Sequence, residues 1–285
     1  MRRDDFAVFI CTHGRPNKQL TLDALQKCGY TGKVYLVLDD TDSSIPQYIE
    51  KFGADNLLVF DKQHYIDTND VGSLPPNFKT ILYAKNAVED MAQDLNLKSF
   101  IIADDDIYSF RIRLPKDEEH LSSFVITDIN PVIKAYSDFM LESDFTAVGI
   151  CGSVHFVAGR KVFDNENIQK YRVPYNFVFR NSKYKMEWVS SFGEDIITAM
   201  EYNKRGHKLL DLPYFQYDTI PPGRAIESGG MSDLYTSMSQ FTLCCYDYIY
   251  NPSSIRLCVN RNRWNAQILK NYVYPKIVSQ SYRKE

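Results

Sequence analysis

Residues Phe100–Asp106 read FIIADDD, an apolar run that ends abruptly in three carboxylates. Such a run is typical of a buried strand whose carboxyl end opens into a ligand-binding cleft. Three neighbouring carboxylates repel one another and raise each other's pKa. A divalent cation such as Mg²⁺ or Mn²⁺ removes this repulsion and keeps coordination positions for phosphate oxygens. The alternative interpretation is an acidic turn in water, in which Asp106 caps a helix.

Strand-like and helix-like segments alternate through the first half of the chain. The expected strands are Phe6–Cys11, Val34–Leu38, Leu57–Phe60 and Phe100–Ala103, and the expected helices are Leu20–Lys27, Ile45–Phe52 and Tyr83–Leu95. Strands that alternate with helices at this pitch predict crossover units and a mainly parallel sheet.

Polar side chains follow the ends of three expected strands. They are His13, Arg15, Asp39, Asp40 and the three aspartates 104–106. Ligands of open α/β sheets bind beyond the carboxyl ends of the strands. We therefore expect these side chains to meet at one edge of the sheet, in an arrangement suited to a small molecule with phosphates.

The second half has a mixed pattern and no linker or internal repeat, which predicts a single domain over residues 1–285. Its expected segments are a helix at 132–141, strand-like sequence at 147–157, a long loop at 159–184, a strand or turn at 187–192, a helix at 194–205, a short strand at 209–212 and a helix at 233–250. The pattern divides this domain into an alternating half at 1–130, a mixed half at 131–230 and a basic helical extension at 231–285.

Composition points to an ordinary globular protein, with 44% hydrophobic and 24% charged residues among 285. No apolar run approaches the roughly 20 residues of a membrane span, and the N-terminus lacks a signal-peptide pattern. The six cysteines lack zinc-ligand spacing. Reduced thiols and a cytoplasmic location are the default expectation.

Basic residues gather in two places despite a net charge of −3. One is the C-terminal segment from Pro252, and the other is Gly159–Trp188, where lysines and arginines alternate with aromatic residues. Cations suit phosphates and aromatic rings suit bases, so both stretches are candidates for nucleic-acid binding. The alternative is a solvated face and a partly packed loop.

Four motifs resemble a known family. They are ICTHGRPN at 10–17, the acidic pair 39–40, AKN at 84–86 and ADDD at 103–106. Together they resemble GT-A glycosyltransferases, and more narrowly the TET/JBP-associated glycosyltransferases, which attach sugars to hydroxymethylated pyrimidines in DNA and occur in phages and kinetoplastids. The resemblance covers roughly residues 6–230. It implies an α/β, Rossmann-like GT-A sheet flanked by helices, with an α-rich C-terminal extension. It also implies that residues 1–130 form the nucleotide-sugar-binding half and residues 131–230 the acceptor and catalytic half.

The resemblance assigns the nucleotide pocket to the first two strand ends. Thr12, His13 and Arg15 would line it, and the Arg15 guanidinium would offer its fork of donors to the diphosphate. Asp39 or Asp40 would accept a hydrogen bond from uracil or ribose.

The helix motif is implied to contact the donor as well. Asn86 would touch ribose or sugar hydroxyls, and Lys85 stands where related enzymes often carry arginine. Lysine keeps the charge but loses the bidentate fork, so its role stays open. A solvated helix start is the alternative for this pair.

Asp104 and Asp106 match the outer residues of a DxD motif, which holds the metal that bridges the donor phosphates. The sequence leaves open which two of the three aspartates ligate the metal. The expected roles are direct metal ligation by Asp106, a metal, ribose or sugar contact by Asp104, and a donor-site position for Asp105. Negative charge builds on the leaving diphosphate, and a metal there acts as a Lewis acid.

Glu194 and Asp195 precede an apolar helix and match the motif that carries the base of inverting members. Asp195 is the expected general base, with Glu194 as the alternate base or a sugar contact. Favourable charge at a helix N-terminus is the alternative explanation.

Weaker donor-site predictions fall on glycines and one arginine in loops. Gly152 follows a strand and would pass close to the donor sugar, and Arg224, Gly229 and Gly230 would close over the diphosphate. Plain turns explain both places equally well.

These features predict a metal-dependent glycosyltransferase that moves a sugar, glucose by preference, from a UDP-sugar to a 5-hydroxymethylpyrimidine in DNA. A saccharide or protein acceptor is the second interpretation, and a non-catalytic nucleotide-sugar or nucleic-acid binding module is the third.

Overall fold

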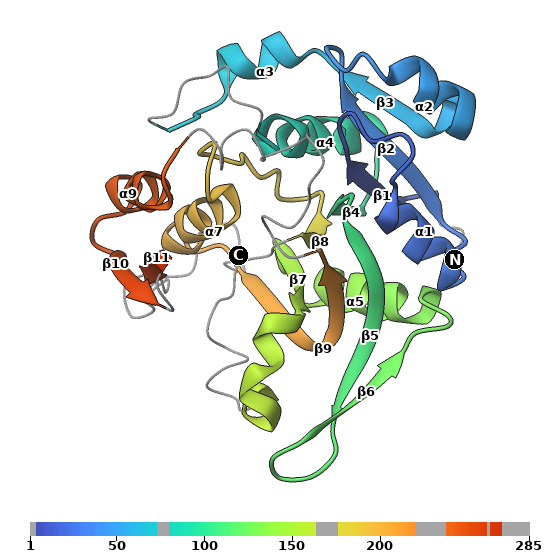
Figure 1. The fold of residues 1–285 in the computed structure, drawn as a ribbon. Helices are drawn as coiled ribbons and strands as arrows, with labels where there is room; N and C mark the ends of the chain where they lie inside the picture. Colours follow the sequence, from blue (N-terminus) through green and yellow to red (C-terminus); the bar gives the residue numbers. More distant parts are fainter. Residues whose placement is uncertain (1–3, 73–79, 164–175, 221–237, 261–262, 270–285) are drawn as a thin grey trace, which may run out of the picture.

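The computed structural model describes residues 4–72, 80–163, 176–220, 238–260 and 263–269. Their centre is a nine-stranded sheet in the order β3-β2-β1-β4-β8-β7-β9-β5-β6 (Figure 1). The strands are β1 Phe6–Cys11, β2 Lys33–Asp39, β3 Leu57–Phe60, β4 Ser99–Asp104, β5 Ile107–Pro115, β6 Leu121–Val125, β7 Ala147–Gly152, β8 Phe177–Asn181 and β9 Leu209–Thr219.

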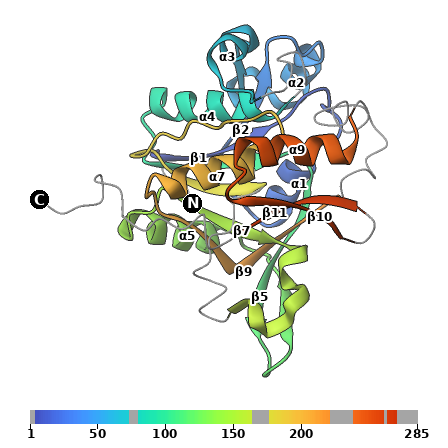
Figure 2. The same ribbon diagram turned by 90° about the vertical axis from the view of Figure 1, so that its left-hand side faces the viewer.

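Helices cover both faces of this sheet (Figures 1 and 2). They are α1 Leu20–Lys27, α2 Ile45–Phe52, α3 Lys62–Thr68, α4 Leu82–Asp94, α5 Asn130–Glu142 and α7 Glu194–Lys204, with short 3₁₀ segments η1 Ala54–Asn56 and η2 Ser153–Phe163. One core contains residues of α1, α2 and α5, and the other contains residues of α3, α4 and α7. The expected α/β architecture is confirmed.

Strands β3, β2, β1 and β4 are parallel, so their carboxyl ends lie on the same side of the sheet. β1 pairs with β2 and with β4, and β2 pairs with β3. Every residue of β1 is buried, as expected for a strand that is covered on both faces. Beyond β4 the sheet is mixed, because β8 runs antiparallel to both of its neighbours and the β5–β6 hairpin completes the far edge.

Three predictions for the second half need correction. The strand expected at 147–157 ends at Gly152 and continues as η2. The segment 187–192 forms no strand, and the long loop expected at 159–184 contains β8. The basic residue in Phe177–Asn181 hid this strand from the sequence pattern, since a buried arginine is rare.

Arg180 holds β8 against α4 through a fully buried ion pair. Its Nε lies 2.6 Å from Glu89 Oε1 and its Nη2 lies 3.1 Å from Glu89 Oε2. Nη2 also donates to the Tyr184 carbonyl at 2.6 Å, and Nη1 donates to the Thr146 carbonyl. These bonds attach the end of β8 to α4 and to the residue before β7, just before the chain enters the loop that leads to α7.

We expect Arg180→Met to lower the free energy of unfolding by about 3–5 kcal/mol, because Glu89 would stay buried without its partner. Urea unfolding followed by circular dichroism measures this change. The matched control is Lys183→Met, which breaks the exposed pair with Asp144 and should lower the free energy of unfolding far less, because water screens that pair. Equal losses in the two variants would contradict the role given to the buried pair.

The C-terminal extension consists of a helix and a hairpin in its described part. α9 spans Gln240–Tyr250, and β10 Ile255–Asn260 pairs antiparallel with β11 Arg263–Ile268. The basic helical extension expected over 231–285 is thus partly wrong, since it also contains two strands. In Figure 1 the extension (orange to red) lies beside α7, and Ile255 shares a small core there with Ile197 and Met200.

Among the residues that the structure describes, no helix is both long enough and apolar enough to cross a bilayer.

Candidate active site

The ends of β1, β2 and β4 bring the predicted polar residues together. His13 Nδ1 lies 2.9 Å from Asp39 Oδ2, and Arg15 Nη1 lies 2.8 Å from Asp105 Oδ1. The first contact joins the loops after β1 and β2, and the second joins those after β1 and β4. The predicted convergence at one edge of the sheet is confirmed.

Asp105 ties the β4 end to the loop after β1. Its Oδ2 accepts a 2.7 Å hydrogen bond from Thr12 Oγ1, while Oδ1 contacts Arg15. Burial raises the pKa of Asp105, and the Arg15 and Thr12 contacts oppose that rise. Both oxygens of this buried carboxylate have protein partners, so the middle aspartate is a structural link and the outer two remain for ligands.

Asp104 and Asp106 each carry one buried oxygen, Oδ1, without a hydrogen-bond partner among the described residues. Burial raises the pKa of Asp106 to about 6, with Asp105 adding to the rise. Burial also raises the pKa of Asp104 well above its ordinary value; Lys85 opposes the rise and Asp106 adds to it. Two crowded carboxylates with free oxygens fit a hard divalent cation, which relieves both the repulsion and the unmet polar atoms.

The described part of the chain shows no cluster of three or more histidine, cysteine or acidic side chains with metal-site geometry. A cation at Asp104 and Asp106 would therefore need oxygens from elsewhere. This agrees with Mg²⁺ sites that use one or two carboxylates together with substrate phosphates.

Asp39 is fixed by its neighbours. Thr41 donates to Asp39 Oδ1, and Lys62 Nζ lies 3.6 Å from Oδ2. Burial alone would raise the pKa of Asp39, but the bonds from His13 and Thr41 and the charge of Lys62 hold it well below its usual range. Asp40 is exposed, and its Oδ1 accepts the Lys62 backbone N–H at 3.0 Å. Asp39 thus stays ionised and orients His13 at the mouth of the site.

Tyr48 was missed by the sequence analysis, although it holds the loop after β1. Its hydroxyl accepts the Arg15 backbone N–H at 3.0 Å and lies 3.0 Å from Thr12 Oγ1. Gln19 Nε2 completes the group at 2.9 Å from Thr12 Oγ1. Tyr48 is the buried residue of α2, and a ring with a polar tip in that position could have signalled its role.

Lys85 and Asn86 lie inside the protein and not at a solvated helix start. Lys85 is 2% exposed, and its Nζ lies 2.8 Å from Glu194 Oε1 and 4.7 Å from the centre of the Trp188 ring. Burial alone would lower the pKa of Lys85, but the carboxylates of Glu194, Asp104 and Asp195 hold it above its ordinary value. This ammonium therefore interacts with a carboxylate at the end of β4 as well as with the two carboxylates that begin α7.

Asn86 positions the loop before α7. Its Nδ2 donates to the Trp188 carbonyl at 2.9 Å and to Asn69 Oδ1 at 3.0 Å, while its Oδ1 accepts the Trp188 N–H at 2.8 Å. Both amide protons are thus donated to protein atoms. The contact with donor hydroxyls predicted for Asn86 stays a prediction; in this structure the side chain is buried and its amide protons are bonded to protein atoms.

Asp195 fits the requirements of a general base. Burial raises its pKa to about 7, Glu194 adds to the rise and Lys85 opposes it. Asp195 Oδ1 accepts the Ile196 N–H at 2.8 Å, so the carboxylate is oriented by the first turn of α7. A base with a pKa near the working pH accepts a proton efficiently. Glu194 is bound to Lys85, which leaves Asp195 as the better candidate.

We expect Lys85→Met to move the acid limb of the pH–rate profile to higher pH. Lys85 lowers the pKa of Asp195, so its removal raises that pKa above about 7 and the base stays protonated to higher pH. The measurement is kcat/KM against pH, with Lys185→Met as the control at an exposed pair with Asp90. An acid limb that does not move would contradict this electrostatic role.

A family model described as TET-Associated Glycosyltransferase matches residues 6–219. The chain belongs to this family. The matched segment contains all nine sheet strands and both carboxylate groups of the site, and it ends before α9. The family assignment predicted from the four motifs is confirmed, and the chain is a glycosyltransferase.

Solved glycosyltransferases are similar to this family member at low identity. Glucosyl-3-phosphoglycerate synthase from Mycobacterium tuberculosis, solved with Mg²⁺ and uridine diphosphate, is 8% identical, with a TM-score of 0.44 over 93% of this chain and 87% of that one. GalNAc-T7, solved with UDP, GalNAc and Mn²⁺, is 12% identical, with a TM-score of 0.45 over 76% and 44%. Such scores transfer neither substrate nor metal. No curated protein matches the chain.

The remaining predicted site residues of this glycosyltransferase are partly outside the described residues. Arg224, Gly229 and Gly230 lie there. Gly152 ends β7, and a Cβ on it would lie 3.2 Å from the Tyr217 hydroxyl. Close packing on β9 therefore explains the glycine, and its contact with the donor sugar stays a prediction.

The basic and aromatic stretch 159–188 is mostly interior where it is described. Its buried members are Val162, Phe177, Val178, Phe179, Arg180, Asn181, Tyr184, Met186 and Trp188. Lys183 and Lys185 are exposed but paired with Asp144 and Asp90. Base stacking on Phe177, Phe179 or Trp188 is wrong, because these rings pack in the two main cores.

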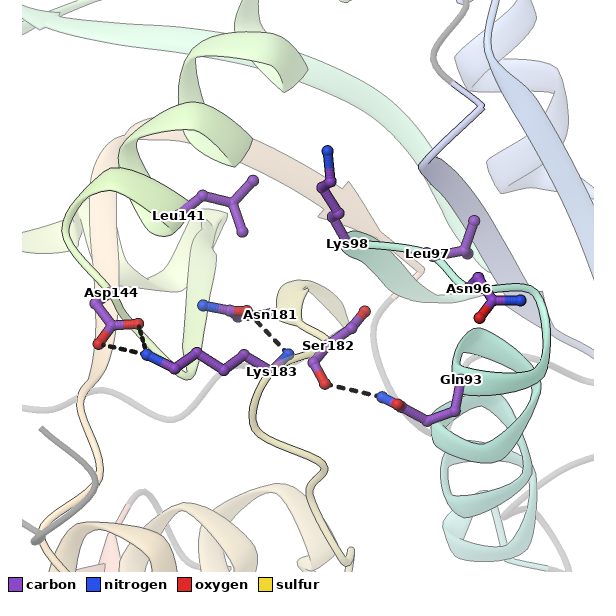
Figure 3. A pocket seen from close by; sticks show the side chains of 9 residues that line it. All are labelled: Gln93, Asn96, Leu97, Lys98, Leu141, Asp144, Asn181, Ser182 and Lys183. Atoms are coloured by element: carbon purple, nitrogen blue, oxygen red, sulfur yellow. Dashed lines mark hydrogen bonds and ion pairs between the residues drawn. The ribbon is translucent and has the colours of Figure 1, made fainter.

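A polar hollow of about 590 Å³ lies beside the amino end of β4 (Figure 3). It is lined by Gln93, Asn96, Leu97, Lys98, Leu141, Asp144, Asn181, Ser182 and Lys183. Figure 3 shows Gln93 bonded to Ser182 and Lys183 bonded to Asp144 across it. Because these residues come from the amino end of β4, the hollow is separate from the site.

Proposed function

We propose that this glycosyltransferase moves a sugar from a UDP-sugar, glucose by preference, to the hydroxyl of a 5-hydroxymethylpyrimidine in DNA, with Mn²⁺ or Mg²⁺ at the donor. One observation carries the proposal. Lys85 Nζ lies 2.8 Å from Glu194 Oε1, and the same ammonium interacts electrostatically with Asp104 and Asp195, which supports a single centre for the donor carboxylates and the base candidate.

The donor side would be held by the ends of β1, β2 and β4. Asp104 and Asp106 would hold the cation, which when bound neutralises charge on the leaving diphosphate. His13, oriented by Asp39, faces the same edge and can donate to the nucleotide. Arg15 lends positive charge there while it stays attached to Asp105.

On the acceptor side, Asp195 would act as the general base. Its carboxylate takes the proton of the acceptor hydroxyl as the oxygen attacks the anomeric carbon and the sugar–phosphate bond breaks. The proton passes to Asp195 and the bonding electrons leave with the diphosphate. A single displacement of this kind inverts the configuration of the sugar, and it needs a base and no protein nucleophile.

A DNA acceptor is supported by the family and by the charge of the extension. Between Pro252 and Glu285 the basic residues are Arg256, Arg261, Arg263, Lys270, Lys276, Arg283 and Lys284, against one glutamate. Arg256 is exposed on β10, where phosphates can reach it. A target base inside a duplex must be flipped out of the stack, at a cost of a few kcal/mol.

A saccharide or a protein side chain is the alternative acceptor, and exposed rings on the extension favour it as much as DNA. Phe241 and Trp264 form an edge-on pair, 4.8 Å between centres, near the α7 side of the molecule. The non-catalytic interpretation no longer holds, because the chain belongs to a glycosyltransferase family.

The test is turnover of UDP-glucose with Mn²⁺, given DNA that contains 5-hydroxymethylcytosine or 5-hydroxymethyluracil, beside unmodified DNA. Mass spectrometry of the digested nucleosides is the readout. A hexose on the hydroxymethylated base alone supports the proposal. Slow UDP release without any modified nucleoside would refute the DNA acceptor and point to saccharide or protein acceptors.

A further inference from the structure

Helix α9 of the extension turns a carboxyl group inward. Its buried residues are Leu243, Cys244 and Asp247, which share one face of the helix, and Asp247 is 3% exposed. A carboxyl group buried beside apolar side chains is costly unless it has a partner. Asp247 Oδ1 has no hydrogen-bond partner among the described residues. This group therefore calls for an explanation beyond packing.

Asp247 lies against the residue that begins the catalytic turn. A Cβ on Gly193 would stand 2.4 Å from Asp247 Oδ1 and 3.1 Å from its Cγ. Gly193 has φ 59° and ψ 29° and directly precedes Glu194 and Asp195. Glycine is required there for two reasons. Other residues disfavour this left-handed backbone, and any side chain would collide with the carboxyl group.

We propose that Asp247 is a positioning residue of the catalytic centre, a third carboxyl group that α9 brings to the first turn of α7 to hold Asp195 in place. This inference rests on the function proposed above. Asp247 lies outside the segment that the family model matches, residues 6–219. The extension thereby contributes to the chemistry of the domain that the family model matches, in addition to any role in binding.

Asp247 performs this role in its neutral form. The charges that act on Asp247 are those of Asp195 and Glu194. Glu194 is in turn paired with Lys85, and both of these interact electrostatically with Asp104. Burial raises the pKa of Asp247 to about 8, and Asp195 and Glu194 add to the rise. Above that pH a further negative charge appears beside the base, repels it, and favours the separation of α9 from α7.

The first test is the pH dependence of kcat/KM for wild type and Asp247→Asn. With wild type we expect the rate at pH 9 to be about tenfold below its plateau, because about a tenth of Asp247 keeps its proton there. The asparagine cannot ionise, so the alkaline decline should vanish and the ratio of rates at pH 9 and pH 7 should rise about tenfold. Asp55→Asn, an exposed change near α2, should keep the wild-type profile. Persistence of the decline in Asp247→Asn would overturn the proposal.

The second test needs no catalytic activity. The folded pKa of Asp247, about 8, lies above the ordinary value of 3.8, so folding holds a proton and stability falls as pH rises between these values. The urea midpoint of Asp247→Asn, relative to wild type, should therefore increase from pH 4 to pH 8. If this increase appears but no transfer is found, the proposed function fails and the placement of Asp247 stands. If transfer is found but the alkaline limb is unchanged, the positioning role fails alone.

A third measurement covers the possibility that Asp247→Asn does not fold. Gly193→Ala is made in wild type and in Asp247→Ala, and the change in urea midpoint is compared. We expect a smaller loss in the second background, because the collision with the carboxyl group is gone and the backbone strain alone remains. Equal losses would show that the two residues do not interact, and would overturn the proposal.

Discussion

Asp195→Asn is expected to reduce kcat for sugar transfer by about 10²–10⁴-fold, the usual contribution of a positioned general base. Asparagine has nearly the same shape and can keep its place at the start of α7, but it cannot accept the acceptor proton. The affinity for the UDP-sugar should change little, because Asp104 and Asp106 lie at the carboxyl end of β4, whereas Asp195 lies in α7. Steady-state transfer and donor titration measure the two quantities separately.

The pH profile provides a second readout for Asp195. Burial raises the pKa of Asp195 to about 7, so the wild-type rate should fall as pH drops below that value and the base becomes protonated. The residual rate of Asp195→Asn should lack this limb. Glu201→Gln, on the same helix and part of an i,i+3 pair with Lys204, is the matched control and should behave as wild type. A variant that keeps more than half of the wild-type kcat would exclude Asp195 as the base.

Asp106→Asn and Asp104→Asn are each expected to reduce metal-dependent transfer by about 10²-fold or more. A bound cation contributes several kcal/mol to the stabilisation of developing charge, and each 1.4 kcal/mol is a factor of ten. Both residues carry a buried oxygen without a partner among the described residues, which the cation would fill. Mn²⁺ titration in the presence of UDP, followed by electron paramagnetic resonance, should show the loss of affinity directly.

The middle aspartate offers a control within the same tripeptide. Asp105→Asn removes the charge that Arg15 Nη1 contacts and should lower the free energy of unfolding by about 1–3 kcal/mol. Its Mn²⁺ affinity should stay closer to wild type than that of the two outer variants. If Asp105→Asn instead lost the most Mn²⁺ affinity, the assignment of the outer pair would be wrong.

The convergence of residues at the carboxyl ends of β1, β2 and β4 was predictable from the sequence because the rule behind it is geometric. Parallel strands point the same way, so residues that follow Cys11, Asp39 and Asp104 must meet. This rule predicts where the residues lie, but it does not predict which hydrogen-bond partners they have. It therefore could not show that Asp105 would bond to Thr12 while its two neighbours kept free oxygens.

The rest could not be predicted because it depends on long-range packing. Arg180 sits in a strand that the alternation of residues could not reveal, since its charge is neutralised by Glu89, 91 residues away. Asn86 matches a donor motif in sequence, yet its amide is enclosed by the backbone at Trp188. Asp247 reaches the site from a helix that follows the last sheet strand, and no local motif announces it.

The contact between Asp105, Thr12 and Arg15 has a consequence for how this family can diverge. A single replacement of Asp105 would leave the other two without a common acceptor, so we expect positions 12, 15 and 105 to change together among relatives. Asp104 and Asp106 should instead vary with the ligand that a lineage uses. The three consecutive aspartates would then be under two different selective constraints. Asp105 is constrained by the contact between the strand ends, and Asp104 and Asp106 are constrained by the substrate.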